Sequence, residues 1–232
     1  MPNLIPLRTT DLFDLTHTLA RPRLEAVEYP WEILPDIPAI IREIGATLDP
    51  ACYHSPAEGI WIAKTATVAP TAHILPPAII GENTEVRHCA YIRGGALVGD
   101  DCVVGNSTEL KNCILFDGVQ VPHYNYVGDS VLGYKAHLGA GAITSNVKSD
   151  KSPVTIKPAV GFEGDFTPIP TGRQKCGAML GDFVEVGCNS VLNPGTVIGA
   201  HSNVYPLSSV RGAVPGNSIF KSGTGSEVVG KE

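Results

Sequence analysis

The chain has 232 residues and a net charge of −6, and its 25 glycines and 19 prolines make up about a fifth of it, more than in an ordinary globular chain. Charged residues are only 17% and aromatic residues 6%, yet 43% of the residues are hydrophobic, which excludes a disordered chain. No apolar run reaches the roughly 18 residues that cross a bilayer, and no signal peptide is visible. The negative charge gives no reason to expect nucleic acid or an anionic membrane as a partner.

Six cysteines are spread along the chain without a C-x-x-C pair. Their density is far below that of a disulfide-stabilised secreted domain. Reduced thiols and a cytoplasmic location are therefore predicted.

Residues 1–54 are predicted to form a small helical cap ahead of the repetitive part of the chain. Apolar residues with approximate helical spacing are Leu34, Ile37, Ile40, Ile41 and Ile44. Two prolines, at positions 35 and 38, confine the better helix to about 38–48. A solenoid needs its open end covered, so we expect this segment to lie over that end.

A repeat of six residues organises residues 55–220. Branched aliphatic residues occupy nine consecutive sixth positions: Ile62, Val68, Ile74, Ile80, Val86, Ile92, Val98, Val104 and Leu110. The phase slips twice and then returns from Leu180 to Val210, and small residues mostly follow four positions after each aliphatic. A period of six fits neither a helix nor an alternating strand. It predicts a three-sided prism whose 18-residue coils stack as parallel strands about 4.8 Å apart.

Glycine often follows the repeated aliphatic, as at Gly81, Gly99 and Gly105. We expect these glycines to adopt the unusual backbone angles of the prism's corners.

Residues 147–178 interrupt the repeat. Val154, Ile156 and Val160 alternate with other residues, which predicts a projecting hairpin. Long loops on regular scaffolds usually serve binding or assembly, so this insertion is a candidate for either. Residues 221–232 are predicted to be a polar tail.

Reactive side chains gather in the middle of the repeat. Glu109 and Lys111 are separated by one residue, and after eleven intervening residues the chain reads HYNYVGD, beginning at His123. The segment GAGAITSN follows at 139–146, and Arg93 precedes the group. Histidine is the side chain best suited to accept a proton near neutral pH. In a scaffold with so few charges, this group is the candidate catalytic cluster.

The order and spacing of these motifs resemble the acetyltransferase half of bifunctional N-acetylglucosamine-1-phosphate uridyltransferase, over roughly residues 55–220. The segments TGRQKCGAMLGD and NPGTVIG look more like archaeal sugar-1-phosphate nucleotidylyltransferases with a C-terminal acetyltransferase domain. The resemblance implies an all-β fold, the left-handed parallel β-helix of the hexapeptide-repeat acyltransferases.

The resemblance also implies an activity, the transfer of acetyl from acetyl-CoA to the amino group of an amino-sugar 1-phosphate such as glucosamine 1-phosphate. No covalent intermediate and no metal would be needed. His123 would be the general base, and Glu109 would orient it or contact a sugar hydroxyl. The implied substrate-binding residues are Arg93, Lys111, Tyr126 and His137. The implied acetyl-CoA-binding residues are Ala140, Asn146, Cys188, Arg173 and Lys175.

The chain departs from the family pattern at three places. His137 stands where the family has an asparagine, Cys188 where it has a serine, and Val147-Lys148-Ser149 where it has Tyr-Asp-Gly. The identity of the amino sugar, and of the acyl group, therefore stays open.

Two other functions remain as alternatives. The coil could be a non-catalytic sugar-phosphate-binding or oligomerisation module beside a separate sugar nucleotidyltransferase. Nucleotidyl transfer by the chain itself is not expected, because the residues before the coil contain no Gly-rich nucleotide loop. A γ-class carbonic anhydrase is disfavoured, since no two histidines have the five-residue spacing of that zinc site. The family resemblance implies a homotrimer with its sites in the clefts between subunits.

Overall fold

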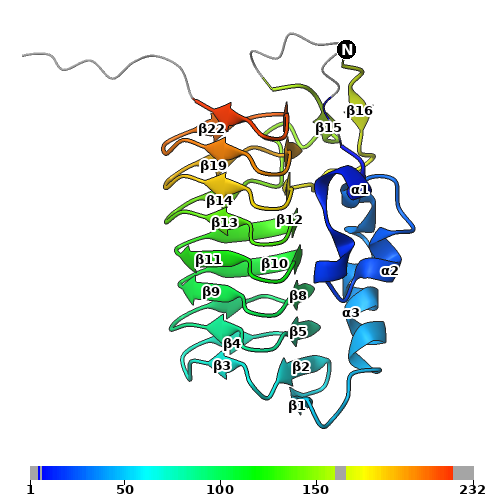
Figure 1. Ribbon diagram of the computed structural model, residues 1–232, viewed down its shortest axis with the longest axis vertical. Coiled ribbons are helices and arrows are strands. Elements are labelled where there is room, and N and C mark those ends of the chain that lie inside the picture. The colour runs from blue at the N-terminus through cyan, green and yellow to red at the C-terminus, as the bar shows by residue number, and fades with distance from the viewer. Residues whose placement is uncertain (1–4, 6, 160–165, 222–232) are drawn as a thin grey trace, which may run out of the picture.

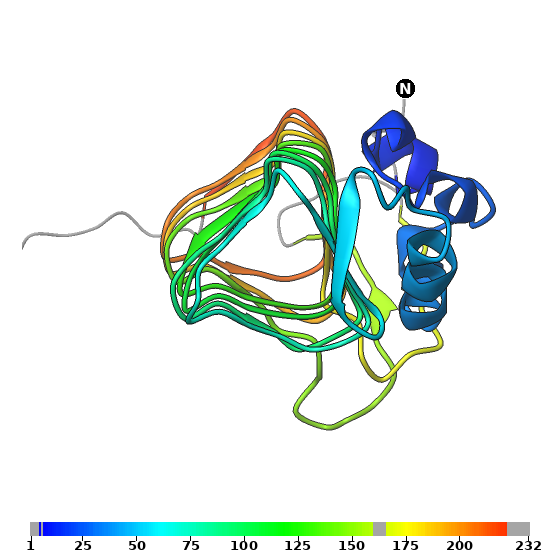
Figure 2. The same cartoon turned by 90° about the horizontal axis from the view of Figure 1, so that it is seen from below.

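Short parallel strands stack into three flat faces around one elongated apolar core (Figure 1). The computed structural model describes residues 5, 7–159 and 166–221. Seen along its axis the solenoid has a triangular outline (Figure 2). The predicted fold class, an all-β left-handed parallel β-helix, is confirmed.

The faces are named A, B and C in the order in which the chain visits them. Face A contains β2 (Ile60–Ala63), β5 (Ala78–Ile80), β8 (Ala96–Val98), the end of β10 (Glu109–Leu115), the end of β12 (Tyr126–Leu132), β17 (Ala178–Leu180), β20 (Thr196–Ile198) and β23 (Ala213–Val214). Face B contains β3 (Thr67–Val68), β6 (Glu85–Val86), β9 (Val103–Asn106), β11 (Gln120–His123), β13 (His137–Leu138), β18 (Glu185–Val186), β21 (Asn203–Val204) and β24 (Ile219–Phe220). Face C contains β4 (His73–Ile74), β7 (Tyr91–Ile92), the starts of β10 and β12, β14 (Ile143–Thr144), β19 (Val191–Leu192) and β22 (Ser209–Val210). Strand β1 (Tyr53–Ala57) pairs antiparallel with β2.

Strand register agrees with the predicted 18-residue coil, except that one coil is a residue shorter. On face C, Ile74 pairs with Ile92, Ile92 with Leu110, and Leu110 with Val127. The last three of these side chains are fully buried, whereas Ile74, in the first coil, is half-buried. The aliphatic of each repeat therefore points inward, and burial of these side chains from water is the main force that holds the coils together.

The glycines after the aliphatics have a different role from the one predicted. Left-handed backbone angles occur at the corners, but mostly at residues with side chains, such as Asn83, Asp101 and Asn189. At Gly105 a Cβ atom would lie 1.6 Å from the carbonyl oxygen of Pro122 in the next coil. Glycine is needed there because successive coils approach closely, and the prediction of unusual angles at that position is wrong.

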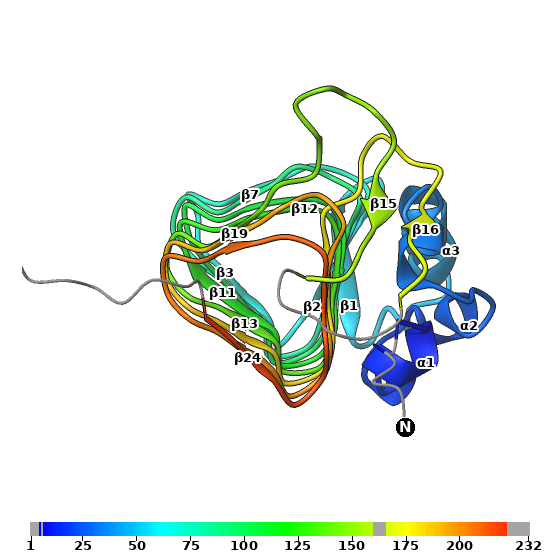
Figure 3. The same cartoon turned by 90° about the horizontal axis from the view of Figure 1, so that it is seen from above.

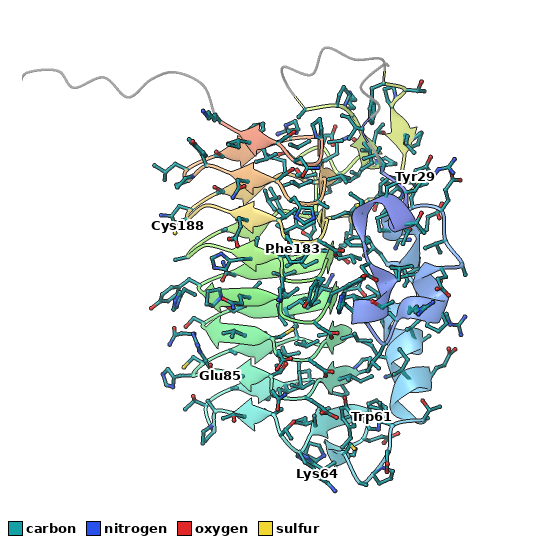
Figure 4. The ribbon with its side chains drawn as sticks, viewed as in Figure 1. Tyr29, Trp61, Lys64, Glu85, Phe183 and Cys188 are labelled. Carbon is teal, nitrogen blue, oxygen red and sulfur yellow. The ribbon has the colours of Figure 1, made fainter. Side chains whose placement is uncertain are left out.

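The N-terminal helices lie along face A, so the prediction that they cover the open end of the coil is wrong (Figure 2). These elements are α1 (Thr9–Leu12), η1 (Leu15–His17), α2 (Arg21–Leu24), η2 (Pro30–Ile33) and α3 (Ile37–Gly45). On face A the residue before the inward aliphatic points outward and is apolar, as at Ile79, Leu97 and Ile114, and all three are fully buried. Trp61 lies beside α3 (Figure 4), where Gly45 gives its ring room. The apolar outer surface of face A would be unfavourable in water, so it requires a cover more than the narrow open end of the solenoid does.

The insertion leaves the corner between faces C and A. Its strands β15 (Thr155–Ile156) and β16 (Ile169–Pro170) pair antiparallel, and they lie on the side of the solenoid that carries α3 (Figure 3). Val154 and Ile156 are buried near Gly195 of a later coil. The insertion is thus a hairpin that packs on the solenoid rather than only projecting from it. Val160, and all of the predicted tail after Lys221, lie outside the described residues.

The six thiols are all free, and Cys102, Cys113 and Cys176 are buried. Burial raises the pKa of Cys113 and of Cys176 to about 12, so both remain protonated at neutral pH. No helix in the described part of the chain is long and apolar enough to cross a membrane.

Candidate active site

His123, Ala140 and Cys188 lie one above another along the corner between faces B and C, here called the BC corner. Gln120 pairs with His137, and His137 with Glu185, so the residues three positions later stack in the same order. The amide of Gly141 donates to the carbonyl of His123 at 2.9 Å, as this register requires. Cys188 projects from the edge of the solenoid away from the helices (Figure 4). The sequence-predicted base and two predicted acetyl-CoA residues therefore share one edge, about 4.8 Å apart per coil.

The backbone that carries His123 is held by Asn125, a residue without a predicted role. Asn125 is 2% exposed, and its Oδ1 accepts the amide of His123 at 3.0 Å. Its Nδ2 donates to the carbonyls of Gly139 and Ala142 in the next coil, at 2.8 and 3.0 Å. The imidazole itself is exposed, and no group in the described ranges hydrogen-bonds to it. The scaffold therefore fixes the position of the ring's backbone and leaves both ring nitrogens open to a ligand.

Arg93 and Lys111, two of the predicted substrate-binding residues, lie in register on adjacent coils of face C. The guanidinium of Arg93 lies 3.1 Å from the carboxylate of Glu109, one coil above it. The hydrogen bond and charge of Glu109 raise the pKa of Arg93, which stays a cation. Glu109 therefore faces Arg93 rather than His123, and in this structure it does not orient the predicted base.

A buried carboxylate lies beside Lys111, at the end of face C away from the BC corner. Asp129 is 4% exposed, and it accepts from Lys111 Nζ at 3.0 Å and from Asn112 Nδ2 at 2.9 Å. Asn146 Nδ2 also donates to it. Asn112 Nδ2 also donates to the carbonyl of Leu34 at 3.0 Å, which ties the helical segment to this cluster. Three donors satisfy the buried charge, as burial of a carboxylate requires.

Tyr126 connects the two ends of face C. Its hydroxyl oxygen accepts from Asn146 Nδ2 at 3.3 Å, and its backbone pairs with Glu109 of the coil below. Burial, followed by the negative charges of Asp129 and Glu109, raises the pKa of Tyr126. The phenol is therefore neutral at pH 7 and can donate its proton in a hydrogen bond to a ligand on face C.

Within one chain, His137 does not lie with the predicted substrate-binding residues of face C. It lies near the start of face B, about 10 Å along the strand direction from the BC corner. Its Nδ1 is 2.7 Å from the carboxylate of Glu185, and both line a pocket of about 430 Å³ with Phe183 and Lys135. The prediction that His137 contacts the same ligand as Lys111 and Tyr126 is not met inside a single subunit, because the two faces point in different directions.

Arg173 and Lys175 lie at another corner from the other predicted acetyl-CoA residues. They belong to the returning part of the insertion, where Lys175 bridges to Val147. The Nε atom of Arg173 is buried and has no hydrogen-bond partner among the described residues. The predicted acetyl-CoA set is therefore divided between the BC corner, with Ala140 and Cys188, and the corner between faces C and A, with Asn146, Arg173 and Lys175.

Sequence reasoning gave no role to Asp129, Asn112 or Asn125. A signal for Asp129 was present, since 18 residues separate it from Lys111 and 17 separate it from Asn146, which is one coil in each case. Residues one coil apart stack at the same corner, so a buried acid between a lysine and an asparagine could have been expected. No comparable spacing pointed to the contact between Asn112 and Leu34.

Among residues 5, 7–159 and 166–221, no three His, Cys, Asp or Glu side chains lie close enough to hold a metal ion. What the site offers is an open imidazole at one corner, a neutral phenol, and two cations on the adjoining face. This combination suits proton transfer beside a bound anion.

Comparison with known families and proteins agrees with the solenoid fold. The family model described as "GMPPB C-terminal domain" matches residues 83–205. A bifunctional sugar-1-phosphate nucleotidylyltransferase/acetyltransferase of Sulfurisphaera tokodaii is 33% identical over 132 residues, covering 57% of this chain and 31% of that protein. A bifunctional protein GlmU of Methanococcus maripaludis is 32% identical over 180 residues, covering 76% of this chain and 42% of that protein. The chain thus spans about a third to two fifths of these relatives.

Solved structures give weaker similarity. A putative acetyltransferase of Bacillus cereus has a TM-score of 0.37 at 20% identity, covering 68% of this chain and 70% of that one. The acetyltransferase domain of PglB from Neisseria gonorrhoeae, in complex with acetyl coenzyme A, has a TM-score of 0.32 at 16% identity, covering 68% of this chain and 51% of that one. These structures therefore carry no argument about function, which has to rest on the chain's own residues and on its sequence relatives.

Proposed function

The chain belongs to the family of the GMPPB C-terminal domain, and from this premise we propose that it is an acetyl-CoA-dependent N-acetyltransferase acting on an amino-sugar 1-phosphate. The observation that carries the proposal is the open imidazole of His123 at the BC corner, beside a face that presents Arg93, Lys111 and Tyr126. The names of the relatives from S. tokodaii and M. maripaludis support the same chemistry.

In the proposed reaction the amine of the sugar is the nucleophile. His123 accepts a proton from the amino group, and the nitrogen forms a bond to the thioester carbonyl of acetyl-CoA. The carbon–sulfur bond then breaks, and the leaving thiolate of CoA takes a proton from the imidazolium. No covalent enzyme intermediate is needed, because a deprotonated amine attacks a thioester directly. Correct placement of the two substrates supplies the rest of the acceleration.

The sugar phosphate would bind to the cations of face C. Arg93 is exposed and offers a planar set of donors, whereas Lys111 is a point charge held by Asp129. Each cation already has a carboxylate partner, so the phosphate would bind as an additional partner. The hydroxyl of Tyr126 lies near Asn146 and Gly128, in the coil next to Lys111, where it would face the sugar. Ala140 and Cys188 would line the path of the acetyl-CoA thioester past His123.

The proposal is tested by incubating the protein with acetyl-CoA and an amino-sugar phosphate. We expect N-acetylated product from glucosamine 1-phosphate or galactosamine 1-phosphate, and none from N-acetylglucosamine 1-phosphate, which has no free amine. Product should be followed by mass spectrometry, because the exposed Cys52, Cys89 and Cys188 would react with thiol reagents. If both amino sugars bind but neither is acetylated, the result favours the alternative function, a non-catalytic binding module.

That second function is favoured by two observations. The matching family model describes a C-terminal domain, and no group of the described chain orients the imidazole of His123. A sugar-phosphate-binding or oligomerisation module that partners a separate nucleotidyltransferase would need the cations of face C but no base. Binding without turnover is its distinguishing result.

The proposal includes a homotrimer, because one subunit does not assemble the predicted site. His137 of one subunit would reach the ligand on face C only if face B of that subunit packed against face C of the next. Exposed apolar side chains lie at the BC corner, with Tyr124 65% and Leu207 75% exposed. Contact between subunits would bury these side chains, which favours association.

Light scattering is expected to give three times the chain mass of 24.5 kDa. Leu207→Glu should shift the protein towards the monomer, since burial of an unpaired carboxylate in an interface is costly. Leu19→Glu is the matched control, because Leu19 is similarly apolar and 43% exposed but lies on the helical segment. A wild-type monomer at micromolar concentration would contradict the shared site.

A further inference from the structure

A groove runs between the insertion and the last coils of face C, beyond the candidate active site. It consists of two adjoining pockets of about 330 and 340 Å³ that share Lys148, Pro194 and Arg211. The insertion supplies one wall, including Lys148 and Lys157, and the strand ends after β19 and β22 supply the other. The groove therefore exists only because the repeat is interrupted at this corner.

Positive charge dominates the groove although the whole chain is negative. Lys148, Lys157 and Arg211 line it, and Asp150 is its only carboxylate among the lining residues. Two hydrogen bonds from Ser152 lower the pKa of Asp150 and occupy one of its oxygens. None of the three cations forms an ion pair with a carboxylate in the described part of the chain. The groove thus has an excess of two positive charges.

Two of the cations are held in place by neutral groups. Arg211 Nη2 donates to Asn193 Oδ1 at 3.1 Å, and Asn193 Nδ2 donates to the carbonyl of Val210 at 2.8 Å. Lys148 Nζ donates to Ser152 Oγ and, at 3.1 Å, to the carbonyl of Pro153. These contacts orient both head groups without neutralising them. Cations oriented in this way lose less side-chain entropy when an anion binds.

The groove is separate from the cations of the candidate active site. Lys111, Gly128, Ser145, Asn193 and Arg211 follow one another along face C, one coil at a time. Four coil steps correspond to about 19 Å between Lys111 and Arg211. A sugar 1-phosphate is too short to reach both positions.

We propose that this groove is a second anion site, which binds the diphosphate group of a diphosphate ester. Arginine binds phosphate oxygens through two parallel hydrogen bonds, and lysine adds a point charge, so Arg211 with Lys148 and Lys157 matches a diphosphate. Coenzyme A and nucleoside diphosphate compounds both contain this group. The inference does not depend on acetyl transfer, since it concerns residues that the proposed reaction does not use.

The test is calorimetric titration of the intact protein with inorganic pyrophosphate, in the absence of any acetyl acceptor. We expect one saturable site per chain that weakens as salt is raised. Arg211→Gln and Lys148→Gln should each weaken binding about tenfold or more, the effect of losing a charged hydrogen bond. Lys221→Gln, on face B, is the control and should bind as the wild type does. Arg93→Gln shows separately whether the anion binds at the candidate active site instead.

Competition identifies the source of the diphosphate. Displacement of pyrophosphate by coenzyme A, or by uridine diphosphate, supports the proposal and names the class of ligand. Displacement by neither would overturn it, as would the absence of saturable binding at millimolar pyrophosphate. Binding that survives in Arg211→Gln and Lys148→Gln but disappears in Arg93→Gln would also overturn it, because the anion would then occupy the candidate active site. Unchanged melting curves of the variants show that the fold is intact.

Discussion

Replacing His123 by alanine is expected to lower kcat for acetyl transfer by about 10²–10⁴-fold, the usual contribution of a general base. The side chain is exposed at the BC corner and no described residue hydrogen-bonds its ring, so its removal leaves no unpaired protein group. The melting temperature and the affinity for the sugar phosphate should therefore stay close to those of the wild type. Steady-state kinetics and direct titration of the sugar phosphate measure the two effects separately.

His54→Ala is the matched control for this experiment. His54 is also exposed, but it lies in β1 at the opposite end of the solenoid from the candidate acetyl-CoA residues. We expect full activity in that variant. Equal activity in His123→Ala and wild type would exclude His123 as the base, whereas equal loss in both variants would point to a general effect of histidine removal on folding.

The second large effect is expected from Gly105→Ala, which should destabilise the protein by roughly 3 kcal/mol or more, at the upper end of overpacking substitutions. The new Cβ would lie 1.6 Å from the carbonyl oxygen and 2.0 Å from the carbonyl carbon of Pro122. Both atoms are backbone, so a rotamer change cannot relieve the contact. The coils of β9 and β11 would have to separate, and the hydrogen bonds and core contacts between them would weaken.

Urea unfolding at one fixed protein concentration measures this effect, since stability depends on concentration in an oligomer. Gly172→Ala is the matched control, because a Cβ at Gly172 would meet nothing within 4 Å. Its φ of +68° still makes alanine unfavourable, by about 1 kcal/mol. A loss for Gly105→Ala no larger than the loss for Gly172→Ala would mean that coil spacing is not what requires glycine at position 105.

Much of the candidate site could be predicted because the repeat converts sequence distance into spatial distance. A coil of 17 or 18 residues brings Lys111, Asp129 and Asn146 to one corner, although they are far apart in the chain. The same rule stacks His123 under Ala140, whereas Cys188 lies 48 residues after Ala140, across the insertion. Such prediction is possible only where the coil is uninterrupted.

Other parts of the site depend on contacts that have no fixed sequence spacing. The pairing of Glu109 with Arg93 follows from the directions of two side chains on face C, and the pairing of His137 with Glu185 spans the insertion. Asn112 is linked to Leu34 across 78 residues, because the helical segment returns to lie on the solenoid. Such contacts depend on how separate segments pack, which a repeat does not encode.

The composition and the six-residue period by themselves predicted the three-sided coil and its inward aliphatics, and the motif resemblance added the candidate catalytic residues. A single strong periodicity was enough, because each coil buries its apolar side chains against the next. Only the tertiary structure decided where the helices lie and what the insertion forms. The apolar residues Ile79, Leu97 and Ile114 on the outside of face A required a cover, and burial of that surface placed the helices along the face. The insertion, packed on the last coils, produced the cationic groove at Arg211.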